Sequence, residues 1–106
     1  MHWSIKIYLY LIPFVLHAAA VCAASDLTVE AAIRDSDDYA VQKAVFMKAT
    51  TSLVQRGTCS IAELKGLGGW VRSQNHKPRP VYFVFCGGLH ISKRIYLDAT
   101  TGELFR

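Results

Sequence analysis

The sequence predicts an α+β domain in which one main helix packs on a three- to four-stranded antiparallel β-meander, with one disulfide between them. Three observations support this. Residues 81–106 carry strand patterning between turn-forming glycines, residues 38–55 repeat apolar side chains at helical spacing, and two cysteines, Cys59 and Cys86, follow an N-terminal export signal. At 106 residues, the chain has room for one such domain.

Residues 1–24 have the three-part order of a secretory signal peptide. Lys6 supplies positive charge, residues 5–16 form an almost unbroken apolar run, and residues 18–24 (AAAVCAA) are small enough for a signal peptidase. The apolar run is shorter than the roughly 20 residues that a membrane-spanning helix needs. We therefore expect a periplasmic or secreted protein with no membrane span after cleavage. A lipoprotein acylated on Cys22 is the alternative.

The two cysteines that follow the signal, Cys59 and Cys86, are predicted to form a disulfide. An exported chain folds in an oxidising compartment, and a small domain gains most from a covalent link. Closing this loop would stabilise the folded state by about 3 to 4 kcal/mol in the chain-entropy description. Two buried free thiols are the alternative.

Charge divides the rest of the chain into an acidic lead-in, residues 25–37, and a basic body, residues 38–106. Between residues 26 and 38 there are five acidic residues against Arg34, whereas residues 39–106 hold ten Lys and Arg against three acidic residues. A basic surface attracts anionic partners. Because the signal directs export, we expect no nucleic-acid partner and favour anionic envelope material, a phosphate-bearing head group or an acidic protein face. A basic surface that serves only solvation is the other interpretation.

The helical part is predicted to begin weakly and then to form one long helix. Residues 25–36 have only weak helical character, so either a short helix or a flexible lead-in is expected there. Ser36, Asp37 and Asp38 offer cap chemistry for a helix over residues 38–55 that Gly57 ends. Its predicted sheet-facing stripe, with Phe46 adjoining, is Val41, Val45, Ala49 and Leu53, and its predicted solvent-facing residues are Lys43, Lys48 and Gln55.

Ser60 and Glu63 have the spacing of a capping box for a short helix over residues 61–65. Residues 70–72 are a candidate first strand. Residues 73–80 (SQNHKPRP) form a polar loop, because two prolines cannot donate to a strand ladder.

Residues 81–86 (VYFVFC) are apolar on both alternating faces, which predicts a central strand covered on both sides. Gly87 and Gly88 break it. In the next strand Ile91, Ile95 and Leu97 share one parity, so that strand is predicted to be buried on one face only. Residues 99–102 turn the chain, and residues 103–105 return as a short edge strand.

Residues 95–106, IYLDATTGELFR, resemble the closing hairpin of PepSY-type domains, small exported modules in which a strand, an Asp, a Thr-Gly turn and a final strand recur. The resemblance covers these 12 residues. It implies a small α+β domain that inhibits or regulates a neighbouring protein in the envelope. It assigns no role to any single residue.

Catalytic and metal chemistry find little support in the sequence, and we expect no enzyme activity and no cofactor. Cys59, His76, Cys86 and His90 would suit zinc, but no close Cys-x-x-Cys pair is present and oxidised cysteines do not bind metal. A thiol hydrolase would use the same cysteines and histidines in a chain with little room for a substrate cleft. Glu63 and Asp98, the candidate carboxylate pair of a glycosidase, are explained by the cap and the turn.

A binding surface fits the composition better. A tryptophan, cations and an asparagine within ten residues of a loop-rich segment resemble the makeup of interaction hot spots. Trp70 is equally interpreted as a core anchor. We expect a small exported, non-catalytic binding protein that inhibits, protects against or regulates another envelope protein; the alternatives are an accessory component of an envelope secretion or conjugation machine, an exported toxin and a small hydrolase. The candidate contact residues are Trp70, Arg72, Asn75, His76, Lys77 and Arg79, extended by Lys93 and Arg94.

Overall fold

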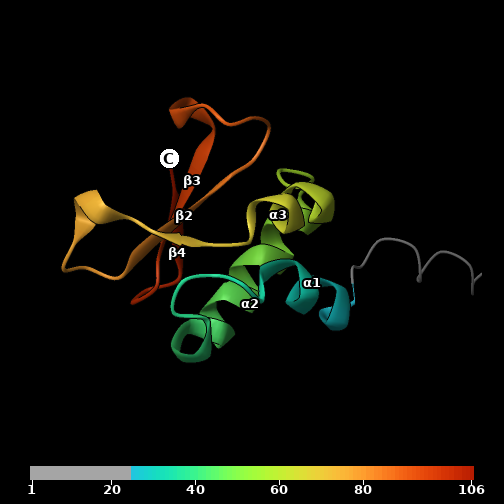
Figure 1. The fold of residues 1–106 in the computed structure, drawn as a ribbon, viewed down its shortest axis with the longest axis horizontal. Coiled ribbons are helices and arrows are strands. Elements are labelled where there is room, and N and C mark those ends of the chain that lie inside the picture. The colour runs from blue at the N-terminus through green and yellow to red at the C-terminus, as the bar shows by residue number, and fades with distance from the viewer. Residues whose placement is uncertain (1–24) are drawn as a thin grey trace, which may run out of the picture.

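The computed structural model describes residues 25–106 and confirms the predicted α+β architecture (Figure 1). Three helices lie on one side of a four-stranded antiparallel sheet with strand order β1-β2-β3-β4. Consecutive strands are neighbours throughout, so the sheet is a simple meander. The predicted signal peptide, residues 1–24, and the alternative lipid site at Cys22 lie outside the described residues.

The first helix, α1 (Asp26–Ile33), lies in the acidic lead-in, for which the sequence left a short helix and a flexible segment as alternatives. Ser25 caps it by accepting a hydrogen bond of 3.2 Å from the backbone N–H of Thr28. Val29 and Ile33 are completely buried. Because these side chains complete the core, residues 26–33 belong to the domain, and the acidic residues of this segment occupy the outer side of a packed helix.

The main helix, α2 (Tyr39–Gln55), has nearly the predicted bounds, but its buried stripe is different. Phe46, Ala49, Thr50 and Leu53 are buried, whereas Val41 is 80% exposed. The predicted stripe followed apolar residues at exact four-residue spacing. Because a helix has about 3.6 residues per turn, such a row drifts around it, and its first member, Val41, lies off the buried face. Lys43, Lys48 and Gln55 face solvent as expected.

The residues before α2 do not act as the predicted caps. Asp38 is the N-cap residue, in a left-handed conformation with φ of 56°, but its side chain makes no capping hydrogen bond. Its carboxylate accepts instead from the Tyr82 hydroxyl at 2.7 Å. Ser36 donates to the carbonyl of Ile33 at 2.6 Å and accepts from the backbone N–H of Trp70 at 2.8 Å. These polar side chains therefore join the helices to the sheet.

The short helix, α3 (Ile61–Leu67), begins with the predicted capping box. Ser60 Oγ accepts from the backbone N–H of Glu63 at 3.1 Å, and Glu63 Oε1 accepts from that of Ser60 at 2.9 Å. After the helix, Gly69 takes a φ of +90° and passes so close to Ser36 and Ile33 that a Cβ there would collide with both. This position therefore requires glycine.

The sheet consists of β1 (Val71–Arg72), β2 (Val81–Phe85), β3 (Arg94–Asp98) and β4 (Glu103–Phe105). In the register Phe83 lies between Val71 and Tyr96, and Tyr96 lies opposite Phe105. The 3-10 turns η3 (Gln74–His76) and η4 (Ile91–Lys93) interrupt the two longer connections. Ile91 corrects the strand prediction: it lies in η4 and is 73% exposed rather than buried with Ile95 and Leu97.

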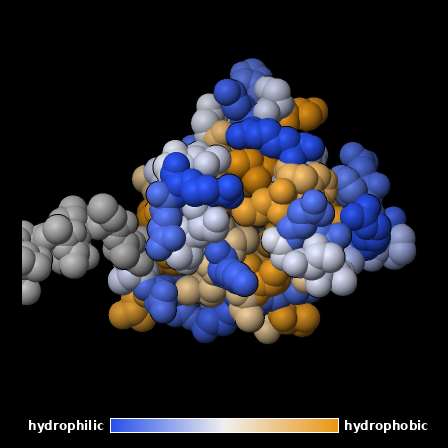
Figure 2. All heavy atoms as spheres, turned by 180° about the vertical axis from the view of Figure 1, so that it is seen from behind, coloured by the Kyte–Doolittle hydropathy of each residue, from blue (hydrophilic) through white to orange (hydrophobic). Residues whose placement is uncertain are grey.

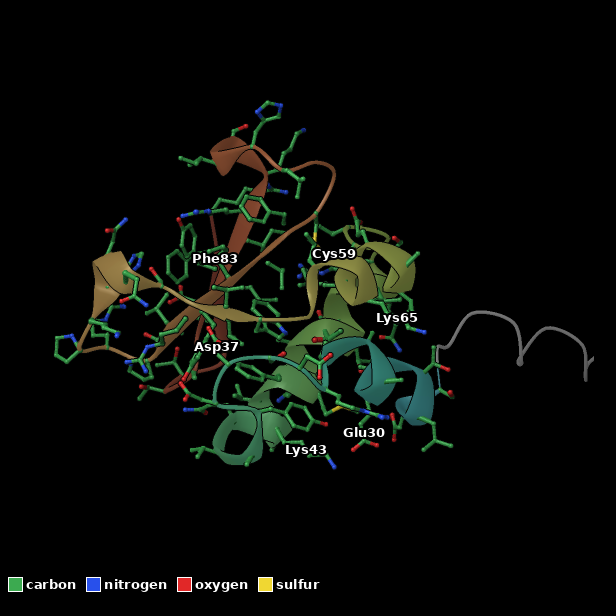
Figure 3. The ribbon with its side chains drawn as sticks, in the orientation of Figure 1. Glu30, Asp37, Lys43, Cys59, Lys65 and Phe83 are labelled. Atoms are coloured by element: carbon green, nitrogen blue, oxygen red, sulfur yellow. A yellow bond between two sulfur atoms is a disulfide. The ribbon has the colours of Figure 1, made fainter. Side chains whose placement is uncertain are left out.

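The core lies between the helices and one face of the sheet. Phe46 of α2 stacks on Trp70 with ring centroids 5.8 Å apart and meets Tyr82 edge-on at 4.9 Å. The predicted disulfide is present: Cys59, before α3, is bonded to Cys86, directly after β2, with Cα atoms 5.0 Å apart (Figure 3). The disulfide therefore joins the helical layer to one end of the sheet.

Candidate protein-binding face

The sheet has a second face, which the three helices do not cover. The strand alternation sends Tyr82, Ile95 and Leu97 toward the helices and the intervening residues to the other side. Figure 3 shows Phe83 on the side of the sheet away from α2 and α3. We call this surface the aromatic face; its residues are Phe83, Phe85, Arg94, Tyr96 and Phe105.

The rings of the aromatic face contact one another across three strands. Phe83 meets Phe85 edge-on at 5.5 Å and Tyr96 at 5.9 Å, and Tyr96 stacks on Phe105 at 5.4 Å with planes 17° apart. Phe83 is 8% exposed, and the other three rings are half-buried. The face is thus a rigid aromatic surface that stays partly open to solvent, the kind of surface that protein interfaces use as anchors.

Arg94 lies across this surface. Its guanidinium carbon is 4.0 Å from the centre of the Phe83 ring and 5.2 Å from that of Phe85, and Nη1 donates to the Tyr96 hydroxyl at 3.3 Å. Within residues 25–106 the ion pairs are Lys43 with Glu30, Arg72 with Asp38 and Arg79 with Asp98, so Arg94 pairs with none of the described carboxylates. An oriented cation on aromatic rings is suited to receive a carboxylate from outside the chain.

The polar loop, residues 73–80, folds down onto the sheet instead of standing free. His76 Nδ1 lies 2.6 Å from Ser73 Oγ, and its ring packs at 5.2 Å from Tyr96 and 6.1 Å from Phe105. Arg79 Nη2 donates to Asp98 Oδ2 at 3.2 Å. The Thr100 backbone N–H, followed by Arg79, lowers the pKa of Asp98. His76 and Arg79 therefore attach the loop to β3 and β4.

Arg72 also makes its contacts within the protein. Its guanidinium reaches Asp38 Oδ2 at 3.4 Å, donates to the carbonyls of Pro78 and Arg79 at 3.4 and 3.3 Å, and lies 5.4 Å from the centre of the Tyr82 ring. Burial, followed by the hydrogen bond to Asp38, raises the pKa of the Tyr82 hydroxyl. Arg72 thus joins the start of α2 to the loop, which is a structural role.

The sequence left two interpretations of Trp70 open, a core anchor and a contact residue. Trp70 is a core anchor, because only 1% of it is exposed. Asn75 and Lys77 remain exposed on the loop, and Lys93 on the next connection. Asn75, together with Gln74, Val71, Phe83 and Arg94, lines a hollow of about 270 Å³ beside β1. Of the eight predicted contact residues, three therefore line one recess: Arg72, Asn75 and Arg94.

From the sequence, the aromatic rings of this face were interpreted as core and so were not among the candidate contact residues. The signal was present, because Phe83, Phe85, Tyr96 and Phe105 fall on one parity of their strands. One main helix covers a single sheet face. Alternating aromatic residues on both faces of a strand therefore imply that some of them lie on the face that the helix leaves open.

The groups considered for other chemistry are occupied by structural contacts. Cys59 and Cys86 are joined to each other, so neither sulfur is a thiolate. Glu63 accepts backbone hydrogen bonds from Ser60 and Gly87, and Asp98 pairs with Arg79. Within residues 25–106, no group of three or more His, Cys, Asp or Glu residues is placed to hold a metal ion, and no helix is long and apolar enough to cross a membrane.

Comparison with known proteins gives no relative: the chain matches no protein-family model, no curated protein and no solved structure. The β3–β4 hairpin forms as the sequence predicts, with Gly102 at a φ of +81° in its turn. Its resemblance to PepSY-type domains stays a prediction.

Proposed function

We propose that this protein is a small exported, non-catalytic binding protein that inhibits, protects against or regulates another protein of the cell envelope, and that the aromatic face is its contact surface. The observation that carries the proposal is Arg94, whose guanidinium lies 4.0 Å above the Phe83 ring without a carboxylate partner among the described residues. Arginine and aromatic side chains supply most of the binding energy in typical interfaces.

The partner is expected to present an acidic segment. Arg94 would receive a carboxylate, and the partly open rings of Phe85, Tyr96 and Phe105 would pack against its apolar flank. The exposed Lys77 and Lys93 add positive charge, which would favour the encounter more than the final affinity. The hollow beside β1 offers room for one further side chain of the partner.

Photo-crosslinking in the producing cell tests this proposal at matched positions. A photoreactive phenylalanine analogue replaces Phe105 on the aromatic face or Tyr39, a half-buried aromatic residue at the start of α2. We expect an adduct of defined mass with one envelope protein from position 105 and none from position 39. The substitution Arg94→Glu should abolish the adduct, and Lys48→Glu, the same charge change on the exposed side of α2, should preserve it.

Equal adducts from both positions, or an adduct that survives Arg94→Glu, would contradict the aromatic face as the contact surface. The substitution Lys77→Glu distinguishes a contribution of the polar loop to binding from that of the aromatic face. Lys77 is exposed and has no hydrogen bond or ion pair from its side chain among residues 25–106, so its reversal should slow association without preventing the adduct.

A further inference from the structure

The connection between β2 and β3, residues 87–93 (GGLHISK), exposes apolar side chains at the end of the sheet. Leu89 is 71% and Ile91 73% exposed. In Figure 1 this connection and η4 protrude beyond the layer of helices. Figure 2 shows hydrophobic atoms at the surface beside hydrophilic ones at the same end of the molecule. We call residues 87–93 the apolar tip.

The tip is held in place at its base. Cys86 is fixed by the disulfide, and its backbone N–H donates to the carbonyl of Lys93 at 3.1 Å. The backbone N–H of Gly87 donates to Glu63 Oε2 at 2.9 Å, and that of Lys93 to the carbonyl of His90 at 2.8 Å. Leu89 and Ile91 are therefore presented by an anchored turn, which lowers the entropy cost of inserting them elsewhere.

The apolar surface continues below the tip. Leu89, Gly88 and Phe85 line a shallow groove of about 360 Å³ together with Glu63, Gly66 and Leu67 of α3. The side chain of Lys93 runs beside the two glycines, since a Cβ at Gly87 or Gly88 would lie 3.8 or 3.7 Å from its methylene carbons. Lysines commonly place their stems on apolar surface while the ammonium stays in the polar layer.

The tip itself carries positive charge. Lys93 lies in it, Arg94 follows it, and residues 87–93 contain no Asp or Glu. The carboxylate beside its base, Glu63, accepts hydrogen bonds from the backbone N–H groups of Gly87 and Ser60. Basic residues beside exposed aliphatic residues are the composition of segments that bind the anionic surface of a membrane. Leu is under-represented at protein hot spots, and the tip has none of the Trp, Tyr or Arg side chains that are enriched there.

We propose that the apolar tip inserts Leu89 and Ile91 into the interface of an anionic lipid bilayer, with Lys93 and His90 at the level of the lipid head groups. The tip adjoins the aromatic face at Phe85 and Arg94, but Leu89 and Ile91 are not part of that face. The protein would therefore present the rings of Tyr96 and Phe105 to a partner while the tip rests on the membrane. This proposal does not depend on the identity of that partner.

A local fluorescence probe tests the insertion on the protein as it is purified from the producing cell. Ile91→Trp places an indole at the tip, and Val41→Trp places one at a position of comparable exposure on α2. Trp70 is buried and contributes a constant background. With vesicles of phosphatidylethanolamine and phosphatidylglycerol, we expect a blue shift for Ile91→Trp and none for Val41→Trp.

A second pair of variants tests the energy of insertion by co-sedimentation with the same vesicles. Leu89→Ser with Ile91→Ser should weaken partitioning by about tenfold or more, because two aliphatic side chains no longer leave water. Leu27→Ser with Val41→Ser, which changes two equally exposed aliphatic residues elsewhere, should leave partitioning unchanged.

Three outcomes would overturn the proposal. The Ile91→Trp emission stays unchanged on the anionic vesicles, or it shifts equally on phosphatidylcholine vesicles, or it shifts only with vesicle-free envelope protein. The last result would assign the tip to a protein partner. Because crosslinking from position 105 reports on the aromatic face alone, failure of either test leaves the other proposal standing.

Discussion

The indole Nε1 of Trp70 donates a hydrogen bond of 3.0 Å to the hydroxyl of Thr50, and both side chains are almost completely buried. This bond crosses from the start of the sheet to the middle of α2. It satisfies the polar atom of the largest core side chain. Thr50 is therefore an anchor for the core, although β-branched residues have a lower helix propensity.

Replacing Thr50 should be costly for this reason. Thr50→Val keeps the side-chain volume but leaves the Trp70 N–H without an acceptor, so we expect a loss of about 1 to 3 kcal/mol in the free energy of unfolding. Urea denaturation followed by circular dichroism measures this loss. Thr51→Val, the neighbouring half-buried threonine, is the control and should change stability little. Equal effects at the two positions would rule out a special role for the bond.

Replacing Gly69 should destabilise the protein, whereas replacing Gly66 should not. Gly69→Ala combines a left-handed backbone with a collision against Ser36 Oγ and Ile33, so we expect a loss of at least about 2 kcal/mol in the free energy of unfolding. Gly66 lies in α3 with nothing within 4 Å of an added Cβ, and Gly66→Ala should stabilise the protein by about 0.5 to 1 kcal/mol. Thermal denaturation of both variants shows whether each change raises or lowers stability. A Gly69→Ala protein as stable as the native one would disprove the close approach of Gly69 to Ser36 and Ile33.

The disulfide should contribute a large part of the stability. Cys59 and Cys86 are 27 residues apart in the sequence, and opening a loop of that length costs about 3 to 4 kcal/mol in the chain-entropy description. Replacing both cysteines by alanine should lower the free energy of unfolding by that amount. Denaturation with and without a reducing agent provides the comparison: the reductant should destabilise the native protein and leave the double variant unaffected.

Glu63 should make stability depend on pH. Backbone hydrogen bonds from Gly87, then from Ser60, lower its pKa from the ordinary value of 4.5. A carboxyl group whose pKa is lower in the folded state stabilises the protein above the unfolded value and loses that contribution as the pH falls through the folded value. Glu63→Gln should therefore be less stable than the native protein at neutral pH.

The difference between the native protein and Glu63→Gln is expected to shrink as the pH is lowered through this range, because both side chains are then uncharged. Denaturant titrations across the acid range measure it. Glu103→Gln, which changes an exposed carboxylate on β4, is the control. A difference between native and Glu63→Gln protein that is constant with pH would assign the Glu63 effect to packing instead of charge.

Local sequence signals predicted the elements of this fold well. The bounds of α2, the capping box of α3 and the strand β2 follow from spacing, since each depends on residues within a few positions of one another. The pairing of Cys59 with Cys86 followed from there being only two cysteines beyond the predicted signal. Contacts that arise only in the folded chain were predicted less well.

The polar loop illustrates why. Arg72, His76 and Arg79 looked like free contact residues, because their partners Asp38, Tyr96 and Asp98 are distant in the sequence or belong to the next strands. Val41 looked buried because a row at four-residue spacing was taken to follow one helix face, whereas at about 3.6 residues per turn it drifts away from the face that carries Phe46 and Leu53. The tip was misassigned for a related reason: Ile91 continues the parity of β3, but η4 takes it out of the strand.

Asp37 limits how copies of this protein can associate through the edges of their sheets. Its backbone N–H donates to the carbonyl of Trp70 at 2.9 Å, and its carboxylate accepts from the backbone N–H of Arg72 at 2.8 Å. These are the outward-facing groups of edge strand β1, to which another strand would otherwise bind. One aspartate thus closes that side of the sheet to edge-to-edge aggregation and confines any intermolecular strand pairing to the three residues of β4.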